Sequence, residues 1–373
     1  MQISIEDQDK IIFFAFRKSQ KVFFDNFLAS CPRKKLNIVT SKKSYFISFK
    51  SFRKIHAVQL NDACHFAVEE FYAKTNIKIP RVLLVGYFKI FSIINFLRYD
   101  AVLDKKYTKM LIWNGGKFRQ LIALEIAKIK QIKVYFFENG FLPNTIVFDE
   151  KGINYNNSVP RDKVFFENYN SKVVLPTSLV PRVGKNREIF KGEKESLPEK
   201  YIFIPFQVDY DTQIISQSPW IKNMRMLFEN IEKIAKNSMY HFIIKEHPSS
   251  GIAYDDLHQR VIDIKNISFR NTHTTQELIE KSIAVVTINS TVGIESLLFH
   301  KKVIVLGEAF YSIEGISYSV KNQKELVSIL EKIEILDVNN VLIDNFLKYL
   351  YHDYLIPKNN DMYDIFCQKM LKD

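Results

Sequence analysis

The sequence is poor in cysteine and lacks the signatures of several common enzyme classes. Its three cysteines, Cys31, Cys64 and Cys367, are odd in number and widely spaced, and no CxxC pair occurs. This argues against a disulfide framework and a cysteine-rich zinc site, and it favours a reducing, cytoplasmic location. No GxxxxGKS/T, GxGxxG, GxSxG or HExxH motif is present, so P-loop kinases, dehydrogenases, α/β-hydrolases and zincins are poor candidates.

Long apolar runs are also missing. The run Ile11–Phe16 is too short for the core of a signal peptide. The longest apolar stretch, Ile79–Leu97, is interrupted by Arg81 and Lys89, whereas a membrane span needs about 20 predominantly apolar residues. We therefore expect neither a signal peptide nor a transmembrane helix.

Acidic residues are scarce at the start of the chain. The net charge is +12, and residues 1–60 hold twelve Lys/Arg but only four Asp/Glu, interleaved with aromatic residues. A basic surface over a buried aromatic core is one interpretation. Contact with an anionic membrane is another, because each basic residue near acidic lipid contributes about 1 kcal/mol. Nucleic acid is the weakest of the three, since no zinc-finger, RNP or helix-turn-helix pattern occurs, and we expect no nucleic-acid partner.

Apolar β-rich runs alternate with helical patterns through most of the chain, which is typical of α/β folds. In the first half, strands are predicted at Ile11–Phe16, Leu36–Thr40, Val82–Gly86, Met110–Trp113 and Ile132–Phe137. Residues 117–130, between the last two strands, have helical periodicity. The resulting βαβ pattern implies a parallel sheet.

Residues 150–200 are polar, their last part reads as an exposed linker, and a second alternation follows. Its predicted strands are Tyr201–Pro205, Tyr240–Lys245, Ile267–Arg270, Ile283–Thr287 and Val303–Leu306, and its predicted helices lie near 221–236, 254–261, 275–282, 293–300, 323–333, 341–351 and 361–371. We therefore predict two doubly wound, Rossmann-like domains, residues 1–185 and 186–344, facing each other across a cleft. Helices within about 345–373 are expected to pack back on the first domain. Ligands of such sheets bind at the carboxyl ends of the strands.

A polar motif, NSTVGIE, follows the predicted strand that ends at Thr287 and opens a helix. Ser290 and Thr291 can cap that helix, and its free N–H groups favour an anion. Gly293 would let a ligand approach the backbone, and the carboxylate of Glu295 could accept ribose hydroxyl groups. The alternative is an ordinary helix cap followed by a favourable acid.

A second motif, KEHP, ends the predicted strand Tyr240–Lys245. Pro248 stops the strand and fixes the turn, so His247 is expected to point into the cleft beside Lys245. Such a histidine could contact a phosphate or donate a proton to a leaving group. A structural histidine is the competing interpretation.

A third motif, PFQVDYDTQ, follows the first strand after the linker and contains Gln207, Asp209 and Asp211. One of the two carboxylates could act at the anomeric centre of a sugar, and a loop with Asx turns is the alternative. The spacing matches a metal-binding DxD motif, but its place at the start of the second domain argues against a metal, and we expect none.

A fourth motif, FFENG, ends a strand of the first domain and places Glu138 at its carboxyl end. Glu138 is a candidate general base, with a solvated turn acid as the alternative. Asn114 closes another strand on the same predicted edge, and Asn154 and Arg161 in the polar loop could help to bind a polar acceptor.

As a set, these motifs resemble those of the capsule polysaccharide β-Kdo transferases. ENG with the following GIN, FQVxxDTQI, KEHP and NSTVGIE occur in the order and approximate spacing of that family, over roughly residues 110–310. The resemblance implies a GT-B fold, with CMP-Kdo bound mainly by the second domain and the acceptor by the first. A single module of this length resembles the enzyme that puts the first β-Kdo on phosphatidylglycerol, at the inner face of the cytoplasmic membrane.

The resemblance also implies roles for individual residues. Retention of configuration requires a carboxylate nucleophile, for which Asp211 is preferred over Asp209, and Glu138 would deprotonate the acceptor. The phosphate of CMP would be held by His247, Ser290 and Thr291. The implied donor site comprises Gln207, Lys245, Ser290, Thr291, Gly293 and Glu295, and the implied acceptor site Asn114, Asn154 and Arg161. Neither a cofactor nor a metal is expected, and other capsule biosynthesis and export proteins are candidate partners.

Three alternatives remain open from the sequence. The His-Pro and Ser-Thr elements also occur in bacterial sialyltransferase-like enzymes, which use another CMP-sugar. An epimerase-like or inverting GT-B enzyme would bind UDP instead of CMP. A non-catalytic capsule assembly protein with the same fold is the third, although the joint presence of Glu138, Asp211, His247 and Ser290 argues against it.

Overall fold

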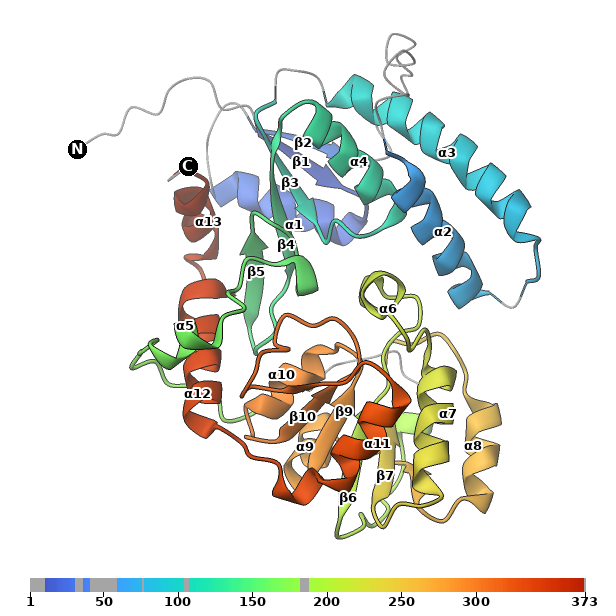
Figure 1. Ribbon diagram of the computed structural model, residues 1–373. Coiled ribbons are helices and arrows are strands. Elements are labelled where there is room, and N and C mark those ends of the chain that lie inside the picture. Colours follow the sequence, from blue (N-terminus) through green and yellow to red (C-terminus); the bar gives the residue numbers. More distant parts are fainter. Residues whose placement is uncertain are drawn as a thin grey trace. The chain divides into compact units, whose positions relative to one another are not determined.

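The computed structural model divides the chain into two compact units (Figure 1). It describes residues 11–30, 36–40, 59–75, 77–103, 107–181 and 188–371. Unit 1 comprises Met1–Gly140, Thr145–Ser158 and Leu355–Asp373, and unit 2 comprises Phe141–Asn144 and Val159–Tyr354. Unit 1 thus ends before the expected boundary at residue 185. One reason is that Phe166 packs against Phe346 of unit 2, with ring centroids 5.1 Å apart.

Unit 1 is built on a sheet with the strand order β12-β5-β4-β3-β1-β2. Its strands are β1 (Ile11–Ala15), β2 (Leu36–Thr40), β3 (Lys109–Trp113), β4 (Lys133–Asn139), β5 (Thr145–Asp149) and β12 (Ile356–Pro357). The strands β2, β1, β3 and β4 are parallel, as predicted, whereas β5 and β12 add an antiparallel edge that the sequence did not reveal.

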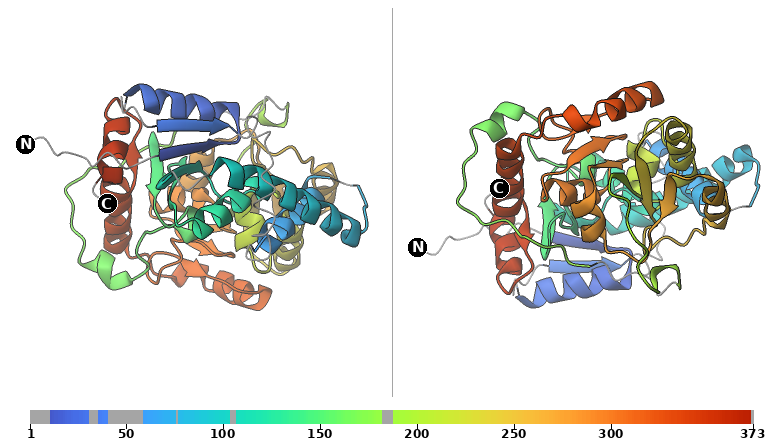
Figure 2. Two further views of the ribbon diagram at one scale, coloured as in Figure 1. Left: turned by 90° about the horizontal axis from the view of Figure 1, so that it is seen from above. Right: turned by 90° about the horizontal axis from the view of Figure 1, so that it is seen from below.

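Helices cover both faces of this sheet because alternate residues of its strands point to opposite sides. The helices of unit 1 are α1 (Lys18–Ser30), α2 (Asn61–Lys74), α3 (Arg81–Val102), α4 (Phe118–Ile129) and α13 (Met362–Leu371). Phe13 of β1 packs on Phe24 and Phe27 of α1, whereas the neighbouring Phe14 packs on Tyr99 of α3. In Figures 1 and 2, α2 and α3 lie side by side, at the opposite end of unit 1 from the C-terminus.

Two expectations for unit 1 are wrong. The predicted strand Val82–Gly86 is the start of α3, because its apolar residues continue at helical spacing beyond Pro80 instead of ending in a turn. The cysteine pattern argued against a disulfide framework, yet Cys367 on α13 is disulfide-bonded, while Cys64 is free and buried. Helix α13 lies against α1 of the same unit, where the ring centroids of Phe366 and Phe27 are 5.7 Å apart.

Helix α3 also bears on the expectation of no transmembrane segment. Among the described residues it is the one helix long and apolar enough to cross a membrane, with a mean hydropathy of 1.4 over 18 residues. Only 33% of that window is buried. The length and composition of α3 therefore do not support the expectation that the chain has no transmembrane helix.

Unit 2 is built on a fully parallel sheet with the strand order β11-β10-β9-β6-β7-β8. The strands are β6 (Tyr201–Pro205), β7 (His241–Lys245), β8 (Ile267–Phe269), β9 (Ala284–Thr287), β10 (Lys302–Val305) and β11 (Tyr318–Ser319). All five predicted strands are confirmed within one or two residues. β11 has only two residues and gave no signal.

Helices again cover both faces of the sheet in unit 2. The helices of unit 2 are α5 (Lys163–Glu167), α6 (Thr212–Gln217), α7 (Met224–Ala235), α8 (Asp255–Arg260), α9 (Thr275–Lys281), α10 (Thr291–Leu297), α11 (Gln323–Glu331) and α12 (Asn340–Tyr349). On one face Ile202 joins a core with α7, α8 and α11, and on the other the adjacent Phe203 joins a core with α9 and α10. The predicted fold class, an α/β protein with two doubly wound units, is confirmed.

Candidate active site

The predicted donor-site residues of unit 2 follow three adjacent parallel strands. Gln207 comes two residues after β6, Lys245 ends β7, and Ser290 comes three residues after β9. Strand β6 lies between the other two and pairs with both of them. These side chains therefore belong to one edge of one sheet, at the carboxyl ends where parallel α/β sheets bind ligands.

Gln207 joins two of the loops at this edge. Its amide nitrogen donates to Asn289 Oδ1 at 3.1 Å, and its amide oxygen accepts from Asn289 N at 3.2 Å and from Thr287 Oγ1 at 3.4 Å. Asn289 in turn donates to the carbonyls of Gln213 and Gln217 at 3.0 and 3.1 Å. Because Gln207 is 5% exposed and both ends of its amide are engaged, it fixes the loop after β6 against the loop after β9.

The two carboxylates of the DYD segment have different surroundings. Asp209 is buried, accepts from Met224 N at 2.7 Å and from Tyr254 Oη at 3.3 Å, and burial raises its pKa to about 6. Asp211 is half-buried and caps α6, accepting from Gln213 N at 2.9 Å. Asp209 thus holds α7 and its neighbours together, whereas Asp211 retains accessible surface for a ligand.

The KEHP segment is anchored by its buried acid. Glu246 is 1% exposed, and its carboxylate lies 2.8 Å from His258 Nε2 and 3.2 Å from Asn271 Nδ2. Lys245 donates to the carbonyl of Asn271 at 2.6 Å, and burial lowers the pKa of its ammonium group to about 8. A histidine and an asparagine from elsewhere in the chain therefore fix the turn that carries Lys245.

His247 lies at the tip of this turn and is half-buried. Its ring Nδ1 accepts the backbone N–H of Ser249 at 3.1 Å. This bond orients the ring and leaves the proton on Nε2, which suits donation to an anion. The sequence prediction of a fixed His-Pro turn agrees with this contact.

Ser290 caps α10, as the sequence predicted. Its hydroxyl accepts from Val292 N at 3.2 Å, and its carbonyl accepts from Tyr311 Oη at 2.6 Å. Thr291 and Glu295 are half-buried. A Cβ on Gly293 would lie 2.5 Å from Tyr311 Oη, so this glycine is required by the packing of Tyr311.

Glu138 in unit 1 is held by the end of the neighbouring strand. Its carboxylate accepts from Trp113 Nε1 at 3.2 Å and from Asn114 Nδ2 at 2.8 Å. Asn114 has a left-handed backbone with φ of 70°, which turns its side chain towards Glu138. Lys358 lies nearby, donates to Asn139 Oδ1 at 3.0 Å, and has its pKa lowered by burial.

The other two predicted acceptor residues are in different units. Asn154 is buried in unit 1 with φ of 53°, inside a loop that Asp149 organises by accepting from Lys151 N and Ser158 N at 2.7 and 2.8 Å. Arg161 is exposed in unit 2, and its guanidinium lies over the ring of Phe310 at 5.6 Å.

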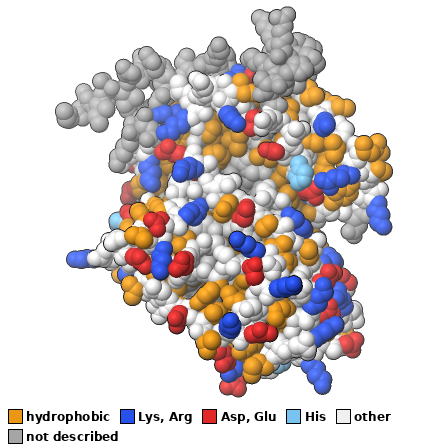
Figure 3. Space-filling view, in the orientation of Figure 1, with side chains coloured by type: hydrophobic (Ala, Val, Ile, Leu, Met, Phe, Trp, Pro, Cys, Tyr) orange, Lys and Arg blue, Asp and Glu red, His pale blue; other side chains and the backbone are white. Residues whose placement is uncertain are grey.

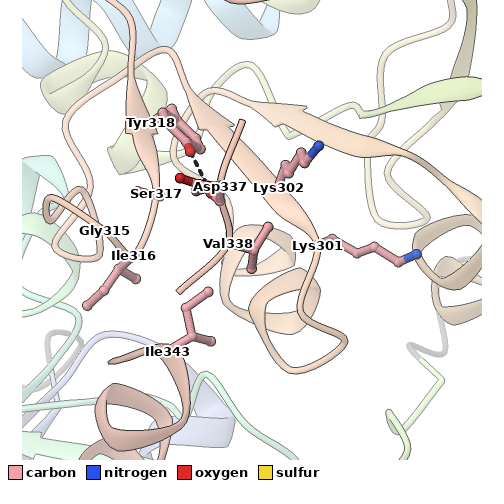
Figure 4. A pocket seen from close by; sticks show the side chains of 9 residues that line it. All are labelled: Lys301, Lys302, Gly315, Ile316, Ser317, Tyr318, Asp337, Val338 and Ile343. Carbon is pink, nitrogen blue, oxygen red and sulfur yellow. Dashed lines mark hydrogen bonds between the residues drawn. The ribbon is translucent and has the colours of Figure 1, made fainter. Parts of the chain in front are cut away.

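A small pocket of unit 2 contains none of these residues (Figure 4). Its cavity volume of about 20 Å³ is enough for roughly one water molecule. Tyr318 at its edge donates to the carbonyl of Asp337 at 2.6 Å. Within the described part of the chain, no group of three or more His, Cys, Asp or Glu side chains is arranged to hold a metal ion.

Comparison with known proteins assigns the chain to a family. The model of a family described as "Capsule polysaccharide biosynthesis protein" matches residues 108–186 and 169–356. The chain belongs to this family. Every predicted site residue, from Asn114 to Glu295, lies inside the matched region, whereas α2 and α3 precede it.

Two curated relatives match this family member over part of their length. Protein FixF of Sinorhizobium fredii (strain NBRC 101917 / NGR234) is 35% identical over 253 residues, which is 66% of this chain and 60% of FixF. The capsule polysaccharide export protein KpsS of Escherichia coli is 25% identical over 52% of this chain and 65% of KpsS. The chain therefore spans less than two thirds of either relative.

A solved structure establishes the fold. The β-Kdo 2,7 transferase of Thermosulfurimonas dismutans KpsC matches with a TM-score of 0.51 and 14% identity, covering 98% of this chain and 99% of that one. This capsule-family chain therefore has a GT-B-like fold with two α/β units, each based on parallel strands. A UDP-GlcNAc 2-epimerase of Methanocaldococcus jannaschii reaches a TM-score of 0.40 and bears on nothing further.

Several residues that shape the site gave no signal in the sequence. Asn271 and His258 fix the KEHP turn, Tyr311 fixes the start of α10, and Lys358 lies beside Glu138. Each lies outside the motif that it supports, at a separation of 12 residues or more from its partner. Only the strand order of the family's fold brings them together, so a search for short motifs could not find them.

Proposed function

We propose that the chain is a retaining β-Kdo glycosyltransferase, which transfers Kdo from CMP-Kdo to a phosphatidylglycerol lipid and so starts the poly-Kdo linker of a capsular polysaccharide. Membership of the capsule biosynthesis family and the GT-B-like fold support a transferase of activated sugars. The observation that carries the proposal is the different burial of the two DYD carboxylates. Asp211 retains accessible surface at the strand-end edge, while Asp209 is committed to the fold.

The donor would bind at the edge of the unit 2 sheet. His247, Ser290 and Thr291 offer N–H and hydroxyl donors for the phosphate of CMP, and Lys245 adds a positive charge near neutral pH because its pKa is about 8. Glu295 would accept the ribose hydroxyl groups. Gln207 and Gly293 would act by positioning, since one joins the two loops and the other makes room for Tyr311.

The reaction would proceed in two displacements. The carboxylate of Asp211 attacks C2 of Kdo, the bond from C2 to the phosphate oxygen breaks, and CMP leaves with the bonding electrons. The acceptor hydroxyl then attacks C2, the ester to Asp211 breaks, and Glu138 takes the hydroxyl proton. Two inversions at C2 give net retention. Asn114 would orient Glu138, and Asn154 and Arg161 would contact the acceptor.

The reaction would take place at the inner face of the cytoplasmic membrane, where a lipid acceptor is presented. The name of the KpsS relative as an export protein suggests that capsule export proteins are partners. Since the chain spans only 60% and 65% of these relatives, both points remain proposals to be tested with the chain itself.

The deciding experiment incubates the protein with CMP-Kdo and short-chain phosphatidylglycerol and follows the product by mass spectrometry. We expect one added Kdo and an equal amount of released CMP. CMP release without a lipid product would keep the donor and redirect the search to a glycan acceptor. A thermal shift with CMP-sialic acid or UDP, but not with CMP-Kdo, would replace the Kdo proposal. Absence of any turnover or CMP binding would favour a non-catalytic assembly protein.

A further inference from the structure

The N-terminal half of α3 exposes a row of large apolar side chains. Val82, Leu83, Tyr87 and Ile90 are 74%, 62%, 58% and 63% exposed. At 100° per residue they fall on one side of the helix together with Gly86, where a Cβ would meet nothing within 4 Å. In Figure 3, hydrophobic side chains gather on the part of unit 1 where Figure 1 places this half of α3.

Cationic residues flank this face, and acidic residues are absent from it. Between Glu70 and Asp100 the sequence contains no Asp or Glu, while Lys78 and Lys89 are exposed beside the apolar row. Arg81 forms an ion pair with Glu69, so it does not count towards the excess. An apolar face bordered by lysine is the pattern of helices that lie in the interface of an anionic bilayer.

The rest of α3, meaning its opposite side and its C-terminal half, is fixed in unit 1. Phe91 stacks on Phe118 of α4 with ring centroids 5.6 Å apart, and Asp100 forms a buried ion pair with Lys130 at 2.9 Å. Ser92 and Asn95 are buried within the same unit. A membrane-spanning α3 would have to leave these contacts and carry Asp100 into lipid, whereas a helix lying on the surface keeps them all.

We propose that Val82, Leu83, Tyr87 and Ile90 form a lipid-docking face that inserts into the interfacial layer of an anionic membrane, with Lys78 and Lys89 at the headgroups. A second copy of the chain is the less favourable occupant, because a symmetric contact would bring the lysines of two identical faces together. The face precedes the region matched by the family model, so the proposal stands independently of the transferase activity.

Vesicle sedimentation tests the proposal with the intact protein. The probes are vesicles of phosphatidylcholine alone and of phosphatidylcholine mixed with phosphatidylserine, an anionic lipid that is not the proposed acceptor. We expect binding to the mixed vesicles only. Leu83→Gln with Ile90→Gln should lower the partition coefficient about tenfold or more. Lys89→Gln should lower it about fivefold.

The matched control replaces two equally exposed apolar residues of unit 2. Ile262 and Ile335 are 73% and 78% exposed, and Ile262→Gln with Ile335→Gln should leave vesicle binding unchanged. Equal loss in both double variants, or none in the α3 variant, would overturn the proposal. Because phosphatidylserine is not the proposed acceptor, vesicle binding is measured independently of Kdo transfer. A failed transferase assay would therefore not contradict the docking face.

A fluorescent reporter separates insertion from adsorption. Tyr87→Trp, in a background that carries Trp113→Phe and Trp220→Phe, should show a blue-shifted emission on mixed vesicles and quenching by lipids brominated in the upper acyl chain. An unshifted emission on bound protein would overturn insertion. Light scattering without lipid provides the remaining check. If the α3 double variant converts a dimer to a monomer and does not alter vesicle binding, the face is covered by a second copy and the lipid proposal is wrong.

Discussion

The polar groups at the strand ends are held very differently in the two units. In unit 2, Gln207 and Glu246 are almost fully buried and bond to residues of other loops. In unit 1, Glu138 is half-buried and is held by Trp113 and Asn114 at the end of one neighbouring strand. A motif residue in unit 2 therefore often serves the fold, and burial is needed to decide which residues remain available for chemistry.

The DYD segment provides the sharpest form of this comparison, because its two acids are chemically identical. Asp211→Asn should lower Kdo transfer by about 10³-fold or more, since an amide cannot act as the nucleophile. Asparagine caps a helix as well as aspartate does, so α6 and the binding of CMP-Kdo should be retained. Product formation and CMP-Kdo affinity are measured together. Near-normal turnover would remove Asp211 from the mechanism.

Asp209→Asn should instead change the free energy of unfolding and the dependence of that free energy on pH. The pKa of Asp209 is raised from 3.8 to about 6, so the fold favours the neutral carboxyl group. The cost of burying its charge is absent below about pH 4, grows between pH 4 and 6, and is complete above pH 6. Wild-type stability should thus fall by about 3 kcal/mol across this window relative to Asp209→Asn.

The chain's two tryptophans, Trp113 and Trp220, allow this stability to be measured for each unit separately, since one lies in each. In a Trp113→Phe background, urea unfolding followed by the fluorescence of Trp220 reports on unit 2. Parallel pH profiles of the wild type and Asp209→Asn would show that the carboxyl group of Asp209 is not the one that titrates.

Glu138 tests whether the less buried site of unit 1 has a chemical role. Glu138→Gln preserves the size of the side chain and can still accept a bond from Trp113 or Asn114. We expect transfer to the acceptor to slow about 10²-fold, while the first release of CMP continues at its normal rate. Rapid-quench measurement separates the two steps. Equal slowing of both would assign Glu138 a structural role.

Gly293 distinguishes packing from ligand approach in unit 2. Gly293→Ala would place a methyl group 2.5 Å from Tyr311 Oη, so we expect a loss of about 2 kcal/mol of unfolding free energy, reported by Trp220. Amide exchange in β9 and α10 should accelerate, while that in unit 1 stays unchanged. A stable variant with weakened CMP binding would instead support the predicted role of Gly293 in ligand approach.

These cases indicate what the sequence could and could not reveal. Apolar periodicity located the five main strands of unit 2, and capping chemistry identified Ser290. Apolar periodicity failed at Val82–Gly86, because a short apolar run fits a strand and a helix equally well. The motifs named the residues at the strand ends. They could not separate Asp209 from Asp211, because burial and long-range partners such as Tyr254 arise only from the fold.

Gly86→Ala has the smallest expected effect on the free energy of unfolding. The sign of this effect is opposite to that of Gly293→Ala. Gly86 lies within a helix on an exposed face, and a Cβ there would meet nothing within 4 Å. Gly86→Ala should therefore stabilise unit 1 by up to about 1 kcal/mol, because alanine loses less backbone entropy in a helix. Trp113 fluorescence in a Trp220→Phe background would report the change in urea. Destabilisation by Gly86→Ala would mean that this face of α3 is covered even without lipid, and would count against both its assignment as free surface and the docking proposal built on it.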